Sequence, residues 1–361
     1  MEKQFPSNGK KVIDLFSGCG GFSLGFKLAG YDIVGHVELD PTLCEIYHAN
    51  FPESRNLGNN VKDVLEANVL TWKKEIGDID VLIGGPPCQG FSLAGKRNRY
   101  DPRNELFLDF VRIASILQPK IILMENVRLL TSMKTADNKI FPEIISEEFE
   151  AAGYEIIYKI VNMQDFGVPQ FRERVFFLGA RNDLKKKPLT FPASLYRPPS
   201  QKSMLNDTRP YRTFKTACSG LESLESGERS PVDPWHWAVT HPPHVIEWLK
   251  DVPEGESAHN NEDPRLRPPS GYNTTYKRIK WNEPCSTIST NFSMISGSRN
   301  VHPTNTRSLT IREAMRCQTF PDSFIFFGKL GDIRKAIGNA LPPFFAKKFA
   351  VHIYKIFFKE N

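Results

Sequence analysis

The segment VLIGGPPCQGFS, which begins at Val81, most constrains how this chain can fold. Its apolar start is followed by two glycines and two prolines, which predicts a short buried strand that ends in a loop. Pro86 and Pro87 restrict the backbone directly before Cys88, so we expect this thiol on a stiff loop at the end of a strand. Ligands bind at that edge of open α/β sheets, although a free cysteine is often an inert buried side chain.

A second segment, VIDLFSGCGGFSLGF at residues 12–26, has the pattern of a strand, a glycine turn and a helix. Gly18, Gly20 and Gly21 would let the backbone approach a ligand, and the helix N-terminus would supply NH groups, as expected around an adenosine-bearing cofactor. A purely structural turn is the alternative. A further apolar run ends at Glu38, roughly 20 residues beyond the turn, where a carboxylate typically binds ribose hydroxyls.

Two more segments place charged side chains beside predicted strands. IILMENV at residues 121–127 is an apolar run that ends near Glu125, which is either a solvated strand end or a pocket acid. FGVPQFRERVFFLGA at residues 166–180 carries Arg172 and Arg174 directly before an apolar strand. Their alternation puts both guanidinium groups on one face of an extended segment. An exposed basic edge that discourages aggregation is the alternative.

Taken in order, these segments resemble the motif series of the DNA cytosine-5 methyltransferases of bacterial restriction-modification systems. RSLTIREAMRCQTFPD at residues 307–322 and GNALPP at residues 338–343 continue the series. The resemblance implies an α/β chain with a Rossmann-like, S-adenosylmethionine-dependent domain on a mostly parallel or mixed sheet. It also implies a smaller, irregular, β-rich target-recognition domain. We expect the catalytic domain at residues 1–185 and 325–361, and the target-recognition domain with its hinge at residues 186–324.

The resemblance also implies covalent catalysis by Cys88. A thiolate that adds to carbon 6 of cytosine makes carbon 5 nucleophilic, so that carbon 5 can accept the methyl group of S-adenosylmethionine. Glu125 would protonate the ring nitrogen beside the amino group, Arg174 would lie near the exocyclic oxygen, and Arg172 would add positive charge nearby. The target cytosine must leave the duplex, because its ring faces are inaccessible inside a base stack.

Cofactor contacts carry over from the family in the same way. The residues implied to surround S-adenosylmethionine are Phe16, Gly18, Gly20, Gly21, Glu38, Asp63, Pro87, Leu106 and Asn339. Two positions depart from the family pattern. Leu39 stands where an aromatic residue often stacks on adenine, and Asp63 follows a lysine rather than the usual glycine.

The region between residues 181 and 310 differs from the rest of the chain. It holds 15 of the 27 prolines, and 18 Lys plus Arg against 13 Asp plus Glu, which is most of the net charge of +6. Such sequence predicts a loop-built domain, which we interpret as the part that recognises double-stranded DNA. Each basic side chain there could read a base, anchor a phosphate or be merely solvated. The candidate DNA contacts, together with those that follow the nucleophile, are Ser92, Lys96, Arg97, Arg99, Lys277, Arg278, Lys280 and Arg299.

The six cysteines show no paired CxxC spacing, which argues against a zinc site or a disulfide framework and for a reducing cytoplasm. We expect no metal, because the chemistry needs none and Pro242-Pro243 interrupts the histidines around it. The N-terminus lacks a signal-peptide core, and no apolar run approaches the ~20 residues of a membrane span.

Two other functions share much of this pattern. A transfer-RNA cytosine-5 methyltransferase would carry the same catalytic motifs, but the Cys-Phe-Thr tripeptide of those enzymes is absent here. A catalytically silent DNA-binding relative would lack part of the catalytic set, whereas Cys88, Glu125, Arg172 and Arg174 are all present. We expect a monomer, and a partner restriction endonuclease acting on the same site is compatible with the chain.

Overall fold

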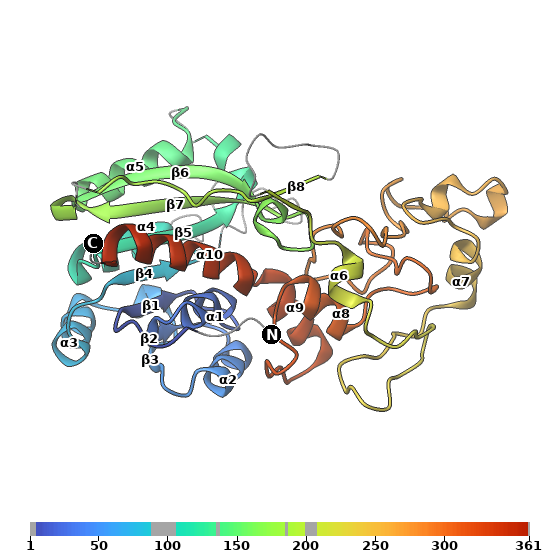
Figure 1. The fold of residues 1–361 in the computed structure, drawn as a ribbon, viewed down its shortest axis with the longest axis horizontal. Helices are drawn as coiled ribbons and strands as arrows, with labels where there is room; N and C mark the ends of the chain where they lie inside the picture. Colours follow the sequence, from blue (N-terminus) through green and yellow to red (C-terminus); the bar gives the residue numbers. More distant parts are fainter. Residues whose placement is uncertain (1–4, 88–105, 135–137, 185–186, 199–207, 360–361) are drawn as a thin grey trace. The chain divides into compact units, whose positions relative to one another are not determined.

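The computed structural model describes residues 5–87, 106–134, 138–184, 187–198 and 208–359, which fall into two compact units (Figure 1). The first unit comprises Met1–Asn162, Glu173–Ala193 and Phe345–Asn361, and the second comprises Met163–Arg172 and Ser194–Phe344. Residues 163–172 and 325–344, which the sequence analysis assigned to the catalytic domain, thus cluster with the second unit. The functional roles of the two regions stay predictions.

The first unit is built on a seven-stranded sheet with the order β3-β2-β1-β4-β5-β7-β6. The strands β1 to β5 pair in parallel, and β7 is antiparallel to both of its neighbours. This mixed, mostly parallel sheet confirms the predicted α/β fold. The strands are β1 (Lys11–Leu15), β2 (Asp32–Val37), β3 (Arg55–Gly58), β4 (Val81–Gly84), β5 (Ile121–Val127), β6 (Tyr154–Asn162) and β7 (Glu173–Arg181).

The strand order reverses at β1, which pairs with β2 on one side and with β4 on the other. In open α/β sheets such a reversal leaves a crevice at the carboxyl ends of the strands, where ligands bind. Because β1, β2, β4 and β5 run in the same direction, the residues that follow them meet at this edge. The glycine turn, Glu38, the segment before Cys88 and the Glu125 region all lie there.

Helices cover the sheet because successive strand residues point to opposite faces. Ile13, Leu82 and Ile122 belong to one buried cluster with residues of α3 and α4. On the other side, Phe176 of β7 contacts Phe345 and Phe349 of α10, with ring centroids 5.0 and 5.2 Å apart. The helices of this unit are α1 (Gly21–Leu28), α2 (Pro41–Asn50), α3 (Glu66–Ile76), α4 (Leu106–Leu117), α5 (Phe141–Ala151) and most of α10 (Pro343–Ile353).

The second unit is irregular, as the prolines predict, but its described residues contain little strand. Proline has no amide to donate to a ladder, so long strands are disfavoured here. Its short elements are β8 (Tyr196–Arg197), β9 (Arg209–Pro210), α6 (Phe214–Cys218), α7 (Pro243–Leu249), α8 (Ile311–Cys317) and α9 (Leu330–Asn339), joined by loops and isolated bridges. The expected β-rich character is therefore limited to these fragments. Across the described parts of both units, no helix is long and apolar enough to cross a bilayer.

A buried ion pair organises the interior of the second unit. Arg307 is fully buried and donates to both carboxylate oxygens of Glu313, at 2.8 and 2.9 Å. Glu313 also accepts from the backbone amide of Thr310, which caps the start of α8. Burial alone would raise the pKa of Glu313, but the adjacent Arg307 holds this pKa at about 2. The carboxylate thus stays charged and keeps the loop before α8 in place.

Replacing Glu313 by Gln should therefore destabilise the protein strongly. The variant leaves the Arg307 guanidinium buried without its counter-charge, a change that typically costs about 3–5 kcal/mol. Chemical denaturation at neutral pH would measure the loss. Glu283→Gln is the matched control, because Glu283 forms an exposed ion pair with Lys280 and should cost less than about 1 kcal/mol. Equal losses in the two variants would contradict the role given to the buried pair.

Candidate active site

The glycine turn after β1 is built from residues with positive φ angles. Phe16, Gly18 and Gly20 have φ of 59, 58 and 92°, and α1 begins directly afterwards at Gly21. A side chain at Gly20 would run into the Phe51 ring, so this position needs glycine. Phe16 holds a backbone conformation that is unfavourable for a bulky residue, and such strain is concentrated at functional sites. The turn points the N-terminus of α1 toward the edge of the sheet.

Glu38 braces this turn from the end of β2. Its carboxylate accepts the backbone amides of Gly18 and Asp40, at 2.7 and 2.9 Å. Burial raises the pKa of Glu38, while these two amides oppose the shift. The side chain of the neighbouring Leu39 is 67% exposed, so it is open to contact with a ligand. The structure thus places the Glu38 carboxylate against the glycine turn, and the predicted contact of Glu38 with a ribose stays a prediction.

Asp14 lies buried beneath the turn and was not among the residues proposed from the sequence. Ser23 donates to its Oδ2 at 2.6 Å and lies 2.7 Å from the Tyr47 hydroxyl. Burial raises the pKa of Asp14 to about 8. The only sequence signal for this residue was an acid placed inside an apolar strand.

Two polar atoms at the turn lack a partner among the described residues, Asp14 Oδ1 and Ser17 Oγ, and both are buried. Buried polar atoms are normally hydrogen-bonded. Two unpartnered polar atoms at the edge of the sheet are therefore expected to form hydrogen bonds to a polar ligand. The Gly18 position adds open space, because no atom lies within 4 Å of where its Cβ would be. These features fit a cofactor that carries amino and hydroxyl groups, such as S-adenosylmethionine.

The segment that leads to Cys88 is held against the end of β5. The side-chain amide of Asn126 donates to the Pro86 carbonyl at 3.1 Å. At Gly85 a Cβ would lie 3.1 Å from Glu125 Oε2, so the bare glycine lets the backbone pass close to this carboxylate. Cys88 itself lies outside the described residues, as do the candidate DNA contacts Ser92, Lys96, Arg97 and Arg99.

Glu125 and Arg174 form an ion pair between β5 and β7. The antiparallel register of these strands pairs Val127 with Arg174, and the distance between Arg174 Nε and Glu125 Oε1 is 2.8 Å. Both side chains are 19% exposed, so a ligand at the sheet edge can reach them. Arg174 Nη1 donates to the Glu173 carbonyl, which leaves Nη2 without a partner among the described residues. The pair therefore combines a held carboxylate with a free donor.

Arg172 has a different environment and a different role from the one predicted. It is buried in the second unit and donates to the carbonyls of Ile288 and Gly338, at 3.1 and 3.0 Å. Gln170 beside it accepts the Ile288 amide and donates to Gln318. Arg172 thus ties backbone segments together, because its terminal nitrogens are used by carbonyls. This structural role differs from the catalytic role that the family resemblance implies for Arg172.

The remaining cofactor candidates lie on separate elements of the two units. Asp63 ends a short 3-10 turn, is exposed, and accepts from the side chain of Asn60. Leu106 is buried at the start of α4, Pro87 is half-buried, and Asn339 is the exposed last residue of α9 in the second unit. Their contacts with a cofactor stay predictions.

Among the DNA candidates of the second unit, Lys277, Lys280 and Arg299 are exposed. Arg278, in contrast, is buried and donates to the carbonyls of Leu249, His302 and Asn305. Its predicted DNA contact is therefore corrected to a structural one, since the loops around it use the guanidinium. Within the described residues, no group of three or more His, Cys, Asp or Glu side chains could hold a metal ion.

The sheet order, the glycine turn held by Glu38 and the Glu125 carboxylate beside the Gly85-Pro86 segment are features that a Rossmann-like methyltransferase would have. The chain belongs to the C-5 cytosine-specific DNA methylase family, whose model matches residues 10–355. It is 34% identical to the type II methyltransferase M.DdeI of Desulfomicrobium norvegicum, over 95% of this chain and 88% of that protein. It is 37% identical to M1.HphI of Haemophilus parahaemolyticus, over 95% and 86% of the two chains.

Solved structures agree on the fold. A protein described as a DNA modification methyltransferase of an E. coli prophage superposes with a TM-score of 0.73, at 26% identity over 96% of this chain and 99% of that one. A DNMT2 variant from Spodoptera frugiperda matches with a TM-score of 0.63 at 18% identity, over 97% and 100% of the chains, which shows the fold alone. Family and relatives identify a DNA cytosine-5 methyltransferase of the restriction-modification type.

Asp14 should make the stability of the ligand-free protein depend on pH. Its folded pKa of about 8 lies above the ordinary aspartate value, so the folded state holds a proton that the unfolded state releases. This contribution is fully present below about pH 4 and is lost as the pH rises toward 8. Asp14→Asn should flatten the fall in unfolding free energy across this window, measured by urea denaturation.

The exposed Asp78 offers the control for this measurement, because Asp78→Asn should leave the pH profile of the wild type unchanged. If the Asp14→Asn profile were as steep as the wild-type profile, the fall would have to come from other groups.

Proposed function

We propose that this enzyme transfers a methyl group from S-adenosylmethionine to carbon 5 of a flipped-out cytosine, in a specific duplex DNA sequence, through a covalent adduct with Cys88. The observation that carries the proposal is the Glu125–Arg174 ion pair, which lies beside the Gly85-Pro86 segment leading to Cys88. A nucleophile, an acid and a cationic donor at one sheet edge are what addition to a cytosine ring requires.

The reaction begins when the Cys88 thiolate forms a bond with carbon 6 of the ring. Electron density then moves to the ring nitrogen, which takes the proton that Glu125 carries in its carboxylic acid form, while Arg174 Nη2 donates to the exocyclic oxygen. Carbon 5 becomes nucleophilic and would take the methyl group, which leaves S-adenosylhomocysteine. A base, for which water is a candidate, then removes the proton of carbon 5, the bond between sulfur and carbon 6 breaks to release the thiolate, and the ring nitrogen returns its proton to Glu125. The ion pair contributes by holding the Glu125 carboxyl at the position that the ring nitrogen must reach.

S-adenosylmethionine supplies an electrophilic methyl group when bound. Support for its site comes from the strained turn at Phe16 and Gly18, the bracing by Glu38, and the unmatched atoms of Asp14 and Ser17. Glu38 would bind the ribose hydroxyls, and the glycine turn would let the cofactor lie close to the protein backbone. The other residues that we assign to this site are Gly20, Gly21, Asp63, Pro87, Leu106 and Asn339.

The second unit would recognise the DNA sequence. Its exposed cations Lys277 and Arg299 are available for bases or phosphates, and Lys280 would have to leave its exposed ion pair with Glu283 to bind them. The buried Arg278 shapes the loops that carry these cations. A single catalytic site and a single recognition unit suffice for one methylation event, so we propose a monomer. The restriction-modification relatives support a partner endonuclease that acts on the same site.

Covalent trapping tests the function directly. A pool of duplexes that carry 5-fluorocytosine, mixed with S-adenosylmethionine, should give a denaturant-resistant adduct, because fluorine cannot be eliminated as the carbon-5 proton is. Cys88→Ser should give no adduct, since the bond to carbon 6 cannot form. Gel electrophoresis detects the complex, and sequencing of the trapped duplexes gives the site. Trapping on fluorinated transfer RNA but not on DNA would instead support an RNA methyltransferase.

Replacing Arg174 should mainly reduce activity, whereas replacing Arg172 should mainly reduce stability. Arg174→Ala removes a donor to the substrate, so kcat should fall about 10²–10³-fold with the unfolding free energy nearly unchanged. Arg172→Ala leaves the buried carbonyls of Ile288 and Gly338 without donors, which should destabilise the protein by about 1–3 kcal/mol for each group. Methylation kinetics and chemical denaturation on both variants provide the comparison. A stable Arg172→Ala protein with the kcat loss expected for Arg174→Ala would reverse the assignment.

A further inference from the structure

Two turns of the second unit expose large side chains that the fold itself does not use. Tyr272 is 81% exposed and Met294 is 51% exposed. The exposed cations Lys277 and Arg299 follow them on the same two segments. Single exposed apolar residues are common, but a group of them beside free cations marks an interaction surface. We call these four residues the Tyr272 patch.

The turn that carries Tyr272 is held in one conformation. The Tyr272 carbonyl accepts from the amide and from the hydroxyl of Thr275, at 2.8 and 2.9 Å. Gly271 before it has φ of 121°, and a Cβ there would lie 3.0 Å from Thr275 Oγ1. The Thr275 carbonyl in turn accepts from the Ser257 hydroxyl at 2.7 Å. The backbone of Tyr272 is therefore fixed, although its side chain is exposed.

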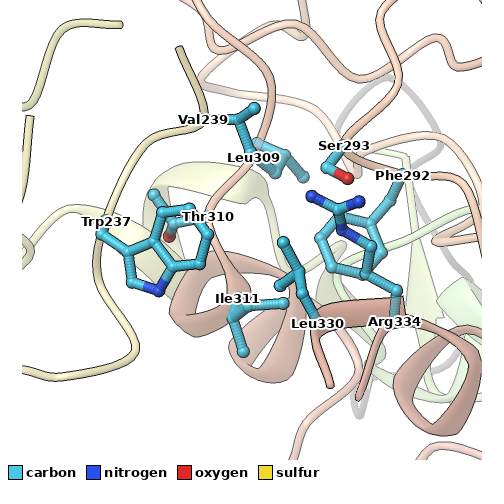
Figure 2. Close-up of a pocket in the computed structure, with 9 residues that line it drawn as sticks. All are labelled: Trp237, Val239, Phe292, Ser293, Leu309, Thr310, Ile311, Leu330 and Arg334. Atoms are coloured by element: carbon cyan, nitrogen blue, oxygen red, sulfur yellow. The ribbon is translucent and has the colours of Figure 1, made fainter. Parts of the chain in front are cut away.

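The turn that carries Met294 is anchored in the interior of the unit. Phe292 is fully buried and lines the same narrow crevice as Leu309 (Figure 2). The Met294 amide donates to the Asn291 carbonyl at 2.9 Å. The Ser298 hydroxyl donates to the Phe292 carbonyl at 3.2 Å, which closes the loop around Met294. This exposed side chain thus also stands on a fixed backbone.

The two turns lie side by side because backbone bonds join their segments. The Tyr276 amide donates to the Ile295 carbonyl at 3.3 Å, and both side chains belong to one buried apolar cluster. Further along, the Val301 amide donates to the Lys277 carbonyl at 3.0 Å. The segments that carry the Tyr272 patch are therefore neighbours in the fold, although they are about twenty residues apart in the sequence.

The cations of the Tyr272 patch are available to a ligand. Lys277 and Arg299 have no ion-pair partner in the part of the chain that the structure describes. Glu256, which precedes the residue bridged to Lys277, accepts instead from the side chain of Asn260 at 3.0 Å. Apolar side chains beside free cations suit a polyanion that also presents apolar groups. Duplex DNA has both, in its phosphates and its base edges.

We infer that the Tyr272 ring contacts the edge of one base of the recognition sequence, with Met294 extending the apolar contact and Lys277 and Arg299 binding phosphates. An aromatic ring gains little from a charged phosphate, but it can pack against a base edge, and apolar contacts of this kind discriminate between bases. The fixed turn limits the ordering cost of binding. This inference rests on the proposed function, because it takes duplex DNA as the substrate.

Trapping from a randomised pool tests the inference at every base position at once. Duplexes with random bases around a 5-fluorocytosine are trapped by the wild type and by Tyr272→Ala, and the adducts are sequenced. The variant should lower the base preference about 10-fold at one position and leave the others unchanged, since one base contact typically supplies discrimination of this size. Equal relaxation at all positions would overturn the inference, because it would indicate a general loss of binding.

Two further variants separate the ring from its surroundings. Tyr272→Phe should keep the wild-type preference, because the ring makes the contact, and relaxation in this variant would contradict the inference. Val232→Ala is the matched control, since Val232 is also 81% exposed in the second unit. It should leave every preference unchanged, and the same relaxation as in Tyr272→Ala would overturn the assignment. Chemical denaturation should give nearly the same unfolding free energy for all of these proteins.

Lys277→Ala addresses the phosphate contacts. It should reduce the slope of log K against log salt concentration by about 0.9 on any duplex, without changing the base preference. An unchanged slope would contradict the phosphate contact of Lys277. Unchanged preference and unchanged DNA affinity in Tyr272→Ala would overturn the inference and point to a protein partner for the patch. Failure of the wild type to trap any duplex would instead contradict the proposed function, so the two failures are distinguishable.

Discussion

The parallel pairing of β4 between β1 and β5 is the constraint on which the site depends. Because β1, β4 and β5 are parallel, all three strands end at one edge of the sheet. The glycine turn after β1 and the Pro86 segment after β4 therefore lie at the same edge as Glu125. Hydrogen bonds then fix the loops that leave this edge, from Asn126 to Pro86 and from Gly18 to Glu38. Because each bond joins segments far apart in the sequence, the chemistry depends on sheet register rather than on local conformation.

Arginine side chains have different roles in the two units. At the sheet edge, Arg174 keeps one nitrogen on Glu125 and another without a partner among the residues that the structure describes, which suits recognition of a ligand. In the proline-rich unit, Arg172, Arg278 and Arg307 replace regular secondary structure as the means of satisfying buried carbonyls and carboxylates. A unit with few ladders has many unpaired backbone oxygens, and a guanidinium with five donors can satisfy several at once. Its positive charge is therefore in part structural.

Motif spacing predicted most of the first unit because its strands are short apolar runs that end in glycine, proline or acidic residues. The turn around Gly18, the ribose carboxylate candidate Glu38 and the position of Glu125 were recognisable for that reason. Asp14 was missed because one acid within an apolar strand has no distinctive pattern, and only burial beside Ser23 distinguishes it. Arg172 and Arg278 were misjudged because a basic residue in a polar segment is usually solvated, whereas here carbonyls surround it.

The amino-acid sequence by itself determined the order of the chemical groups along the chain, and through it the α/β class and the family. Strand periodicity and turn residues act over a few positions, so they can be recognised without coordinates. Only the tertiary structure decided which cations are free, because a partner such as Glu313 for Arg307 or the Gly338 carbonyl for Arg172 comes from a different segment. Charge is a property of the residue, but its availability depends on what the fold packs against it.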